Sequence, residues 1–242
     1  GDGTTIYDHS GNSNHGTIYG ATWTTDVYVP PFQPQTTAEL QTAVDMWVDD
    51  NATALATYGE INTWDVSLIT NMSQLFYQKS TFNNDISAWD VSNVTDMSYM
   101  FRAATSFNQD LSTWNVSNVI NMLDMFAYTD AFNQDISGWD VSSVTNMETM
   151  FRITNSFNQD ISMWDVSNVT NFLFMFIGAN ALSEENQCAI HTSWSVQNDA
   201  WPYEWEEFCE NLWCQPVIAA IQDTSMDEDS ELVLQLSAES EE

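Results

Sequence analysis

Apolar and polar residues recur along this chain with a fixed period of 25 residues. One copy reads FNNDISAWDVSNVTDMSYMF from Phe82, and similar copies begin at Phe107, Phe132 and Phe157. A weaker copy ends at Phe76. A period of this length is typical of stacked repeats, because one such unit is too small to bury its own apolar face.

The apolar spacing changes within each unit and predicts two elements. Between residues 86 and 91 apolar side chains alternate with polar ones, which indicates a short strand. Between residues 94 and 101 they recur at three- and four-residue steps, which indicates a short helix. We therefore expect an α/β fold of about five coils, each made of strand, turn, short helix and turn.

Stacking would align equivalent residues in columns. One column is a buried structural spine of tryptophans, Trp64, Trp89, Trp114, Trp139 and Trp164. A second column holds flexible side chains suited to filling gaps between coils, Met72, Met97, Met122 and Met147, with Phe172 at its end. Both columns are interpreted as core and not as ligand-binding boxes.

Different patterns flank the repeats and predict caps. Residues 36–56 carry an amphipathic helical stripe behind Thr36 or Thr37, with Glu39 in the first turn, and are expected to form a helical N-terminal cap. After Trp164 the tryptophan period stops, and residues 182–214 are expected to form a C-terminal cap. Capping is needed because a stack of repeats otherwise exposes an unpaired edge.

The three cysteines fall inside the expected C-terminal cap. They are Cys188, Cys209 and Cys214, and no histidine stands at metal-ligand spacing from them. We favour a disulfide between Cys188 and Cys209. Pairing of Cys214 with either of the other two remains open.

Charge excludes several classes of partner. The chain has three Lys or Arg against 35 Asp or Glu, a formal net charge of −32. Nucleic acid and anionic membrane surfaces would be repelled, because both are bound through Lys and Arg. No apolar run reaches the roughly 20 residues needed to span a bilayer.

Acidic and polar residues repeat with the coils and mark a candidate binding face. Its members follow the tryptophans: Asp65, Asp90, Asn115, Asp140 and Asp165, with Ser92, Ser117, Ser142 and Ser167. Just before the strand a second ladder is a possible calcium site: Asp85, Asp110, Asp135 and Asp160. Hydrogen bonds from neighbouring backbone amides are the preferred explanation for both ladders, and no residue is assigned a catalytic role.

The repeated phrase W-D-V-S-x-V-T-x-M-x-x-M-F resembles the bacterial BspA-like leucine-rich-repeat surface proteins across residues 57–181. The resemblance implies a leucine-rich-repeat-type solenoid between two caps. It also implies an extracellular location at a bacterial cell surface and a role in adhesion through protein–protein contact. It supplies no catalytic residues and no cofactor.

The chain ends resemble pieces of other domains. Residues 1–23 are similar to the last strands of a laminin-G-like or concanavalin-like lectin sandwich, and residues 24–35 read as a Pro-rich linker. Residues 215–242 are similar to the start of an immunoglobulin-like or cadherin-like module. We expect a fragment of a multidomain surface protein whose secretion signal lies outside this sequence. The expected function is a non-catalytic scaffold that binds a protein or glycan. The alternative is a carbohydrate-binding module, with or without calcium.

Overall fold

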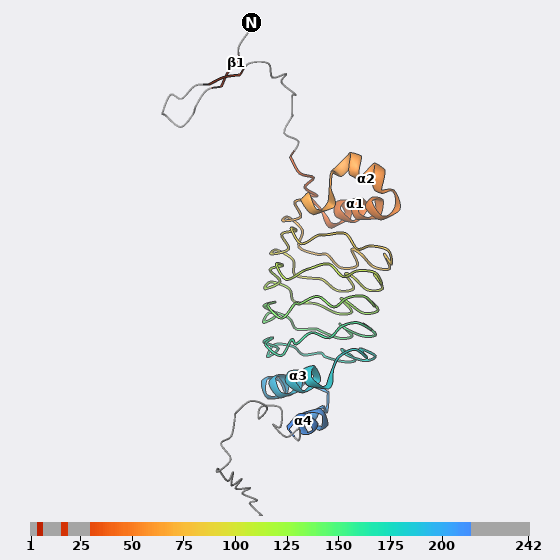
Figure 1. Cartoon of the computed structure of the whole chain (residues 1–242), viewed down its shortest axis with the longest axis vertical. Helices are drawn as coiled ribbons and strands as arrows, with labels where there is room; N and C mark the ends of the chain where they lie inside the picture. Colours follow the sequence, from red (N-terminus) through yellow and green to blue (C-terminus); the bar gives the residue numbers. More distant parts are fainter. Residues whose placement is uncertain (1–3, 7–15, 19–29, 214–242) are drawn as a thin grey trace, which may run out of the picture.

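The computed structural model describes residues 4–6, 16–18 and 30–213. Residues 4–6, 16–18 and 211–213 are described by their backbone alone. Figure 1 shows a stack of flat coils between two helical pairs, α1 with α2 and α3 with α4. Strands β1 (Thr4–Ile6) and β2 (Gly16–Ile18) pair antiparallel. Apart from these two strands, the expected lectin-like segment lies outside the described residues, as do residues 24–29 of the linker, Cys214 and the expected immunoglobulin-like segment 215–242.

The expected α/β leucine-rich-repeat solenoid is wrong. Between residues 59 and 181, all of them described, the chain forms no strand and no α-helix; its one helical element is the 3-10 turn η1 (Ile61–Thr63). The strand predicted at 86–91 and the helix predicted at 94–101 are both absent. Successive coils are joined by isolated parallel bridges at Asn71, Asp96, Asn121, Asn146 and Asn171.

The backbone conformation explains why helical spacing did not produce a helix. Tyr99 and Ala103 have φ angles of 60° and 59°, in the left-handed region where a right-handed helix cannot continue. The N–H groups of Tyr99 and Phe101 donate to the carbonyl oxygens of Leu123 and Met125 in the next coil, at 2.8 and 2.9 Å. The intervening N–H groups donate three residues back within their own coil. Polar backbone groups are thus satisfied without a regular element.

This left-handed geometry recurs in every coil. The non-glycine residues with positive φ are Gln74, Gln78, Tyr99, Ala103, Asp124, Tyr128, Thr149, Ile153 and Phe174. Each costs about 1–2 kcal/mol relative to the right-handed conformation. Hydrogen bonds to the next coil offset that cost, so the conformation depends on contacts 24 residues away and not on local propensity.

The tryptophans predicted to form an internal column are buried, each with at most 4% of its surface exposed. The indole Nε1 of Trp89, Trp114, Trp139 and Trp164 donates to a carbonyl 28 residues earlier, at 2.8–3.2 Å. The column of methionines ending in Phe172 is buried as well. Phenylalanines stack beside them, as in the pair Phe101 and Phe126, whose ring centroids lie 5.5 Å apart at an interplanar angle of 3°. Each coil therefore binds its neighbour through the interior.

Two helices cover the first coil, as the N-terminal pattern predicted. Helix α1 (Thr37–Asp49) begins where the Thr36 hydroxyl accepts the N–H of Glu39, and α2 (Asn51–Tyr58) follows. On α1, the Thr37 hydroxyl donates to the Asn71 carbonyl at 2.8 Å. One turn later, the Gln41 amide donates to the Leu75 carbonyl at 3.1 Å. The two side chains donate to carbonyl oxygens of the first coil. The equivalent carbonyl oxygens of later coils accept N–H groups from the preceding coil, which the first coil does not have.

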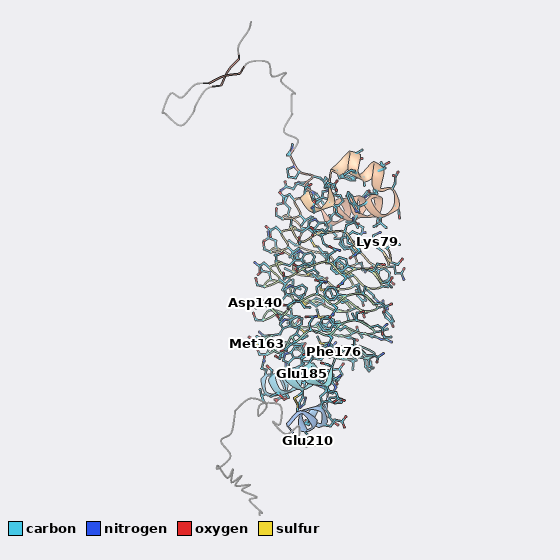
Figure 2. All side chains as sticks on the ribbon, viewed as in Figure 1. Lys79, Asp140, Met163, Phe176, Glu185 and Glu210 are labelled. Atoms are coloured by element: carbon cyan, nitrogen blue, oxygen red, sulfur yellow. A yellow bond between two sulfur atoms is a disulfide. The ribbon has the colours of Figure 1, made fainter. Side chains whose placement is uncertain are left out.

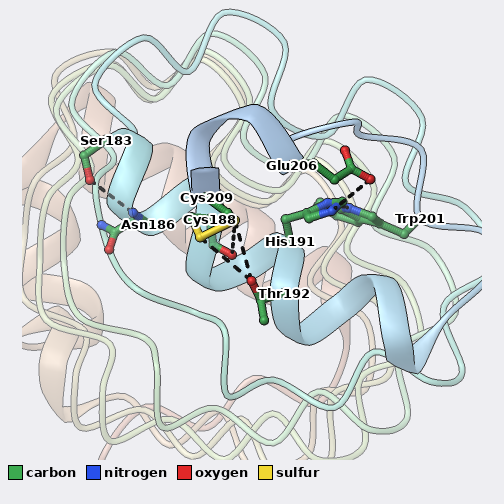
Figure 3. The surroundings of a disulfide bond; sticks show 8 residues. All are labelled: Ser183, Asn186, Cys188, His191, Thr192, Trp201, Glu206 and Cys209. Atoms are coloured by element: carbon green, nitrogen blue, oxygen red, sulfur yellow. Dashed lines mark hydrogen bonds and ion pairs between the residues drawn. A yellow bond between two sulfur atoms is a disulfide. The ribbon is translucent and has the colours of Figure 1, made fainter. Parts of the chain in front are cut away.

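The C-terminal cap closes the other end. Helix α3 (Glu184–Gln197) places Trp194 on Trp164 with ring centroids 6.1 Å apart, and this extends the tryptophan column. A disulfide between Cys188 and Cys209 joins α3 to α4 (Glu206–Trp213), the pairing that the sequence favoured. Figure 3 shows His191 beside it, bonded to Trp201 at 3.1 Å and facing Glu206 at 3.3 Å. These contacts give His191 a structural role in the cap.

Candidate binding face

The candidate binding face forms one edge of the stack. We call it the Asp–Ser face: Asp65, Asp90, Asn115, Asp140 and Asp165, with Ser67, Ser92, Ser117, Ser142 and Ser167. Asp90, Asn115, Asp140 and Asp165 are exposed, whereas Asp65 is half-buried. Figure 2 places Asp140 at this edge and Lys79 at the opposite one. The structure therefore brings the residues predicted for this face together in a row, one position per coil.

Each acidic side chain of the face is held by its own coil. The Asp140 Oδ1 accepts the Ser142 N–H at 3.1 Å and the Ser142 hydroxyl at 2.6 Å. Asn115 makes the same two bonds to Ser117, at 3.2 and 2.8 Å. This is an Asx turn, in which a side chain caps the backbone two residues later. The turn fixes one oxygen and leaves the other directed away from the backbone amide.

The turns favour the ionised form of three carboxylates of the face, those of Asp65, Asp140 and Asp165, by lowering their pKa values. The hydrogen bond from the Ser67 hydroxyl has the largest effect on the pKa of Asp65 and lowers it. Burial raises this pKa and the Ser67 N–H lowers it, each by less, so the pKa lies below its ordinary value. The serine hydroxyl is also the largest cause, ahead of the serine N–H, of the lowered pKa of Asp140 and of Asp165. The neighbouring Asp165 charge raises the pKa of Asp140, but its effect is smaller. The face is therefore anionic through the neutral range.

The second ladder, proposed from the sequence as a possible calcium site, has the same turn geometry as the Asp–Ser face. Asp85, Asp110, Asp135 and Asp160 each accept the N–H of the serine two residues later, at 2.8–2.9 Å. That N–H is the main reason that the pKa of Asp110 is lowered, against repulsion from the ladder neighbours. Within the part of the chain that the structure describes, no three His, Cys, Asp or Glu are grouped so that they could hold a metal ion. The calcium hypothesis gains no support from this arrangement.

A ladder of asparagines, which the sequence did not lead us to predict, bonds successive coils to one another. The Asn108 Oδ1 accepts the N–H of Asn133 at 2.9 Å and the side chain of Gln134 at 2.9 Å. The same pair of bonds is repeated at Asn83 and Asn133, and at Asn158 the C-terminal cap supplies the donors. The repeated FNQD phrase contained the signal for these bonds.

A shallow hollow of about 590 Å³ lies next to the Asp–Ser face. Its lining residues are Asn93, Thr95, Asn118, Ile120, Ser143 and Thr145. The Asn93 and Asn118 amides donate to the carbonyls of Ser67 and Ser92 one coil back, which fixes both side chains. Ile120 is 48% exposed and supplies an apolar surface among hydroxyls and amides.

None of the described helices is long and apolar enough to cross a bilayer. This agrees with the expectation drawn from the sequence, within the described residues.

A comparison with protein families gives one match. The model of the family described as "Mycoplasma protein of unknown function, DUF285" matches residues 45–144 and again residues 112–210. The match supports the resemblance to BspA-like surface repeats at the level of a related repeat family, without confirming its leucine-rich-repeat, lectin-like or immunoglobulin-like parts. No curated protein and no solved structure matches the chain.

Proposed function

Because this chain belongs to the DUF285 family, whose description leaves the function open, we propose a role from its geometry. In this proposal, the chain is a non-catalytic scaffold and binding module of an extracellular surface protein, and its Asp–Ser face contacts a protein partner. The row of turn-held carboxylates along one edge carries this proposal, because it offers the same anionic group in a fixed orientation in four of the five coils, with the neutral Asn115 in the middle one. Preorganised side chains lose little conformational entropy on binding.

The equivalence of the acidic residues favours binding over catalysis. General acid–base chemistry needs two carboxyl groups whose environments push their pKa values apart. Here Asp65, Asp140 and Asp165 each lie in the same kind of turn in their own coil, and the pKa of each is shifted downward by its serine. A row of like groups suits an extended partner with regularly spaced cations.

A second candidate function, carbohydrate binding, is favoured by the hollow beside this face. Fixed amides and hydroxyls around an exposed apolar side chain can hydrogen-bond sugar hydroxyls and contact a sugar ring. Asn118 and Thr145 would supply polar groups, and Ile120 the apolar contact.

The test uses the whole chain, biotinylated and applied to an array of extracellular-matrix proteins and to a glycan array. The variant Asp140→Asn with Asp165→Asn keeps the turn acceptor, as Asn115 does, and removes two charges. Under the proposal, the wild type binds one or more matrix proteins and the variant binds them several-fold more weakly. Selective glycan binding that is lost in Ile120→Ser supports the second candidate. Equal binding by the wild type and both variants would rule out this edge of the stack as the binding surface.

A further inference from the structure

The opposite edge of the stack carries all three of the chain's basic residues, Lys79, Arg102 and Arg152. Lys79 contacts Asp45 on α1 at 2.7 Å. Arg102 and Arg152 occupy the same repeat position, two coils apart, so their surroundings can be compared directly. In a chain of net charge −32, every cation would be expected to find a carboxylate.

Arg102 has both aromatic and acidic partners within the molecule. Its guanidinium carbon lies 5.6–5.8 Å from the ring centroids of Tyr77, Tyr99 and Tyr128, and its Nε is 3.8 Å from an Asp124 oxygen. Cation–π contacts and an ion pair together stabilise a guanidinium at a partly buried site.

Arg152 shares the Tyr128 ring with Arg102 but lacks an acidic partner among the described residues. It lies 5.6 Å from the Tyr128 ring, and among the described residues it forms no ion pair. Its Nε is buried and has no hydrogen-bond acceptor in the described part of the chain. A buried donor without an acceptor is costly, and here it belongs to a cation.

The repeat register shows which carboxylate is missing. Asp124 follows Arg102 by 22 residues, and the residue 22 positions after Arg152 is Phe174. Phe174 is 48% exposed and has a φ of 58°, a conformation that bulky residues rarely adopt. The last coil therefore presents an aromatic ring where the earlier coil presents the counter-ion.

Two further apolar side chains of the last coil are exposed beside Phe174. Leu173 is 48% exposed and Ile177 is 44% exposed. Ile177 occupies the same repeat position as Arg152, one coil later. Arg and aromatic side chains are the residues most enriched at the centres of protein interfaces. We define the Arg152 patch as Arg152, Leu173, Phe174 and Ile177.

We propose that the Arg152 patch binds an acidic segment of a partner protein, with a partner carboxylate on the Arg152 guanidinium and apolar partner side chains on Phe174 and its neighbours. The missing counter-ion decides the chemistry of the occupant, because the patch supplies a cation and apolar surface but no acid. The surface is distinct from the Asp–Ser face, and it does not depend on the function proposed for that face.

The probe is a fluorescein-labelled peptide of alternating Asp and Leu, and its control is the same peptide with Asn in place of Asp. Binding to the whole chain is measured by fluorescence anisotropy at about 0.15 M salt, which screens the chain's net charge. We expect the Asp peptide to bind at least tenfold more tightly than the Asn peptide. Arg152→Gln should weaken its binding about tenfold, whereas the matched variant Arg102→Gln should leave it unchanged.

A third variant, Phe174→Asp, places a carboxylate where Asp124 stands relative to Arg102. It should supply Arg152 with an internal counter-ion and abolish peptide binding, while circular dichroism shows the wild-type fold. Equal affinity for the Asp and Asn peptides, or equal loss in Arg102→Gln and Arg152→Gln, would overturn the proposal. A wild-type dimer in sedimentation velocity that is lost in Phe174→Asp would overturn it in favour of a second copy as occupant.

Discussion

The interior and the Asp–Ser edge follow the same 25-residue period, yet they use it in opposite ways. In the interior, Trp139 donates its indole N–H to the Leu111 carbonyl and stacks on Trp164 in the next coil. At the edge, Asp140 bonds to Ser142 in its own coil. Identical aromatic residues attract when stacked, whereas identical carboxylates repel. Interior columns therefore join the coils, and edge columns shape each coil separately.

This difference separates stability from recognition. The edge residues can change without loosening the stack, because their bonds lie within one coil. The interior residues cannot, because each contributes to both neighbours. The following predictions test that separation, from the largest expected effect to the smallest.

Replacement of Trp114 by alanine should be the most damaging change. Trp114 is 4% exposed and donates to the Ile86 carbonyl, so the substitution leaves a cavity and removes one of the two hydrogen bonds that this carbonyl accepts. We expect a loss of about 3–5 kcal/mol in the free energy of unfolding. Urea denaturation followed by circular dichroism measures it, with Trp114→Phe as the control that keeps most of the volume. A loss below about 1 kcal/mol would contradict the internal tryptophan column.

Replacement of Asn133 by alanine tests a surface column that does bond between coils. The Asn133 Oδ1 accepts the Asn158 N–H at 2.8 Å and the Gln159 side chain at 2.7 Å. We expect a loss of about 1 kcal/mol, because water can replace part of these bonds at an exposed site. The same urea titration applies. An effect as large as that of Trp114→Ala would mean that the asparagine ladder, and not the core, governs stacking.

Asp140→Asn should leave stability almost unchanged. The amide oxygen can accept from Ser142 as Asn115 does from Ser117, and one repulsive charge is removed. We expect a change of less than about 0.5 kcal/mol in the free energy of unfolding. A larger loss would show that the Asp–Ser edge contributes to cohesion of the stack.

The stability difference between the wild type and Asp140→Asn should change with pH by a smaller amount still. Because the Ser142 bonds lower the pKa of Asp140 in the folded chain, its ionised form stabilises the fold above the ordinary value of 3.8. The contribution is lost as the pH falls through the lowered folded value. The stability difference between wild type and Asp140→Asn should therefore shift against the wild type between pH 6 and pH 2, as measured by urea titration at each pH. A difference that stays constant would contradict the Asx-turn assignment.

The sequence was sufficient to predict the repeat and its buried columns, to narrow the helical start to Thr36 or Thr37, and to favour the Cys188–Cys209 pairing over two alternatives. These depend on period, apolar spacing and capping chemistry, which local patterns carry. The conformation inside each coil could not be predicted in this way. Residues 94–101 have helical apolar spacing, but Tyr99 turns left-handed because its N–H bonds to Leu123 in the following coil. Neither residue type indicates this conformation by itself.

The residues of the Asp–Ser face could be predicted because an Asp, or in one coil Asn115, follows each repeat tryptophan in the sequence. The Arg152 patch could not be predicted in this way. It is recognised only when Arg152 is compared with Arg102, which has an acidic partner where Arg152 has none among the described residues. That comparison needs the register of the coils in space, which places Phe174 at the counter-ion position.

Between residues 72 and 78, and at the equivalent positions of later coils, alternate N–H groups donate to carbonyl oxygens of the next coil, so this side of the stack has a donor end and an acceptor end. Thr37 and Gln41 meet the acceptor end, and the Tyr203 hydroxyl meets the Phe176 N–H at the donor end. Any inserted unit presents the same donors and acceptors as the unit that it displaces. In-frame duplication or deletion of 25 codons can therefore lengthen or shorten the rod while both end pieces keep their contacts, so that copy number sets the reach of the protein.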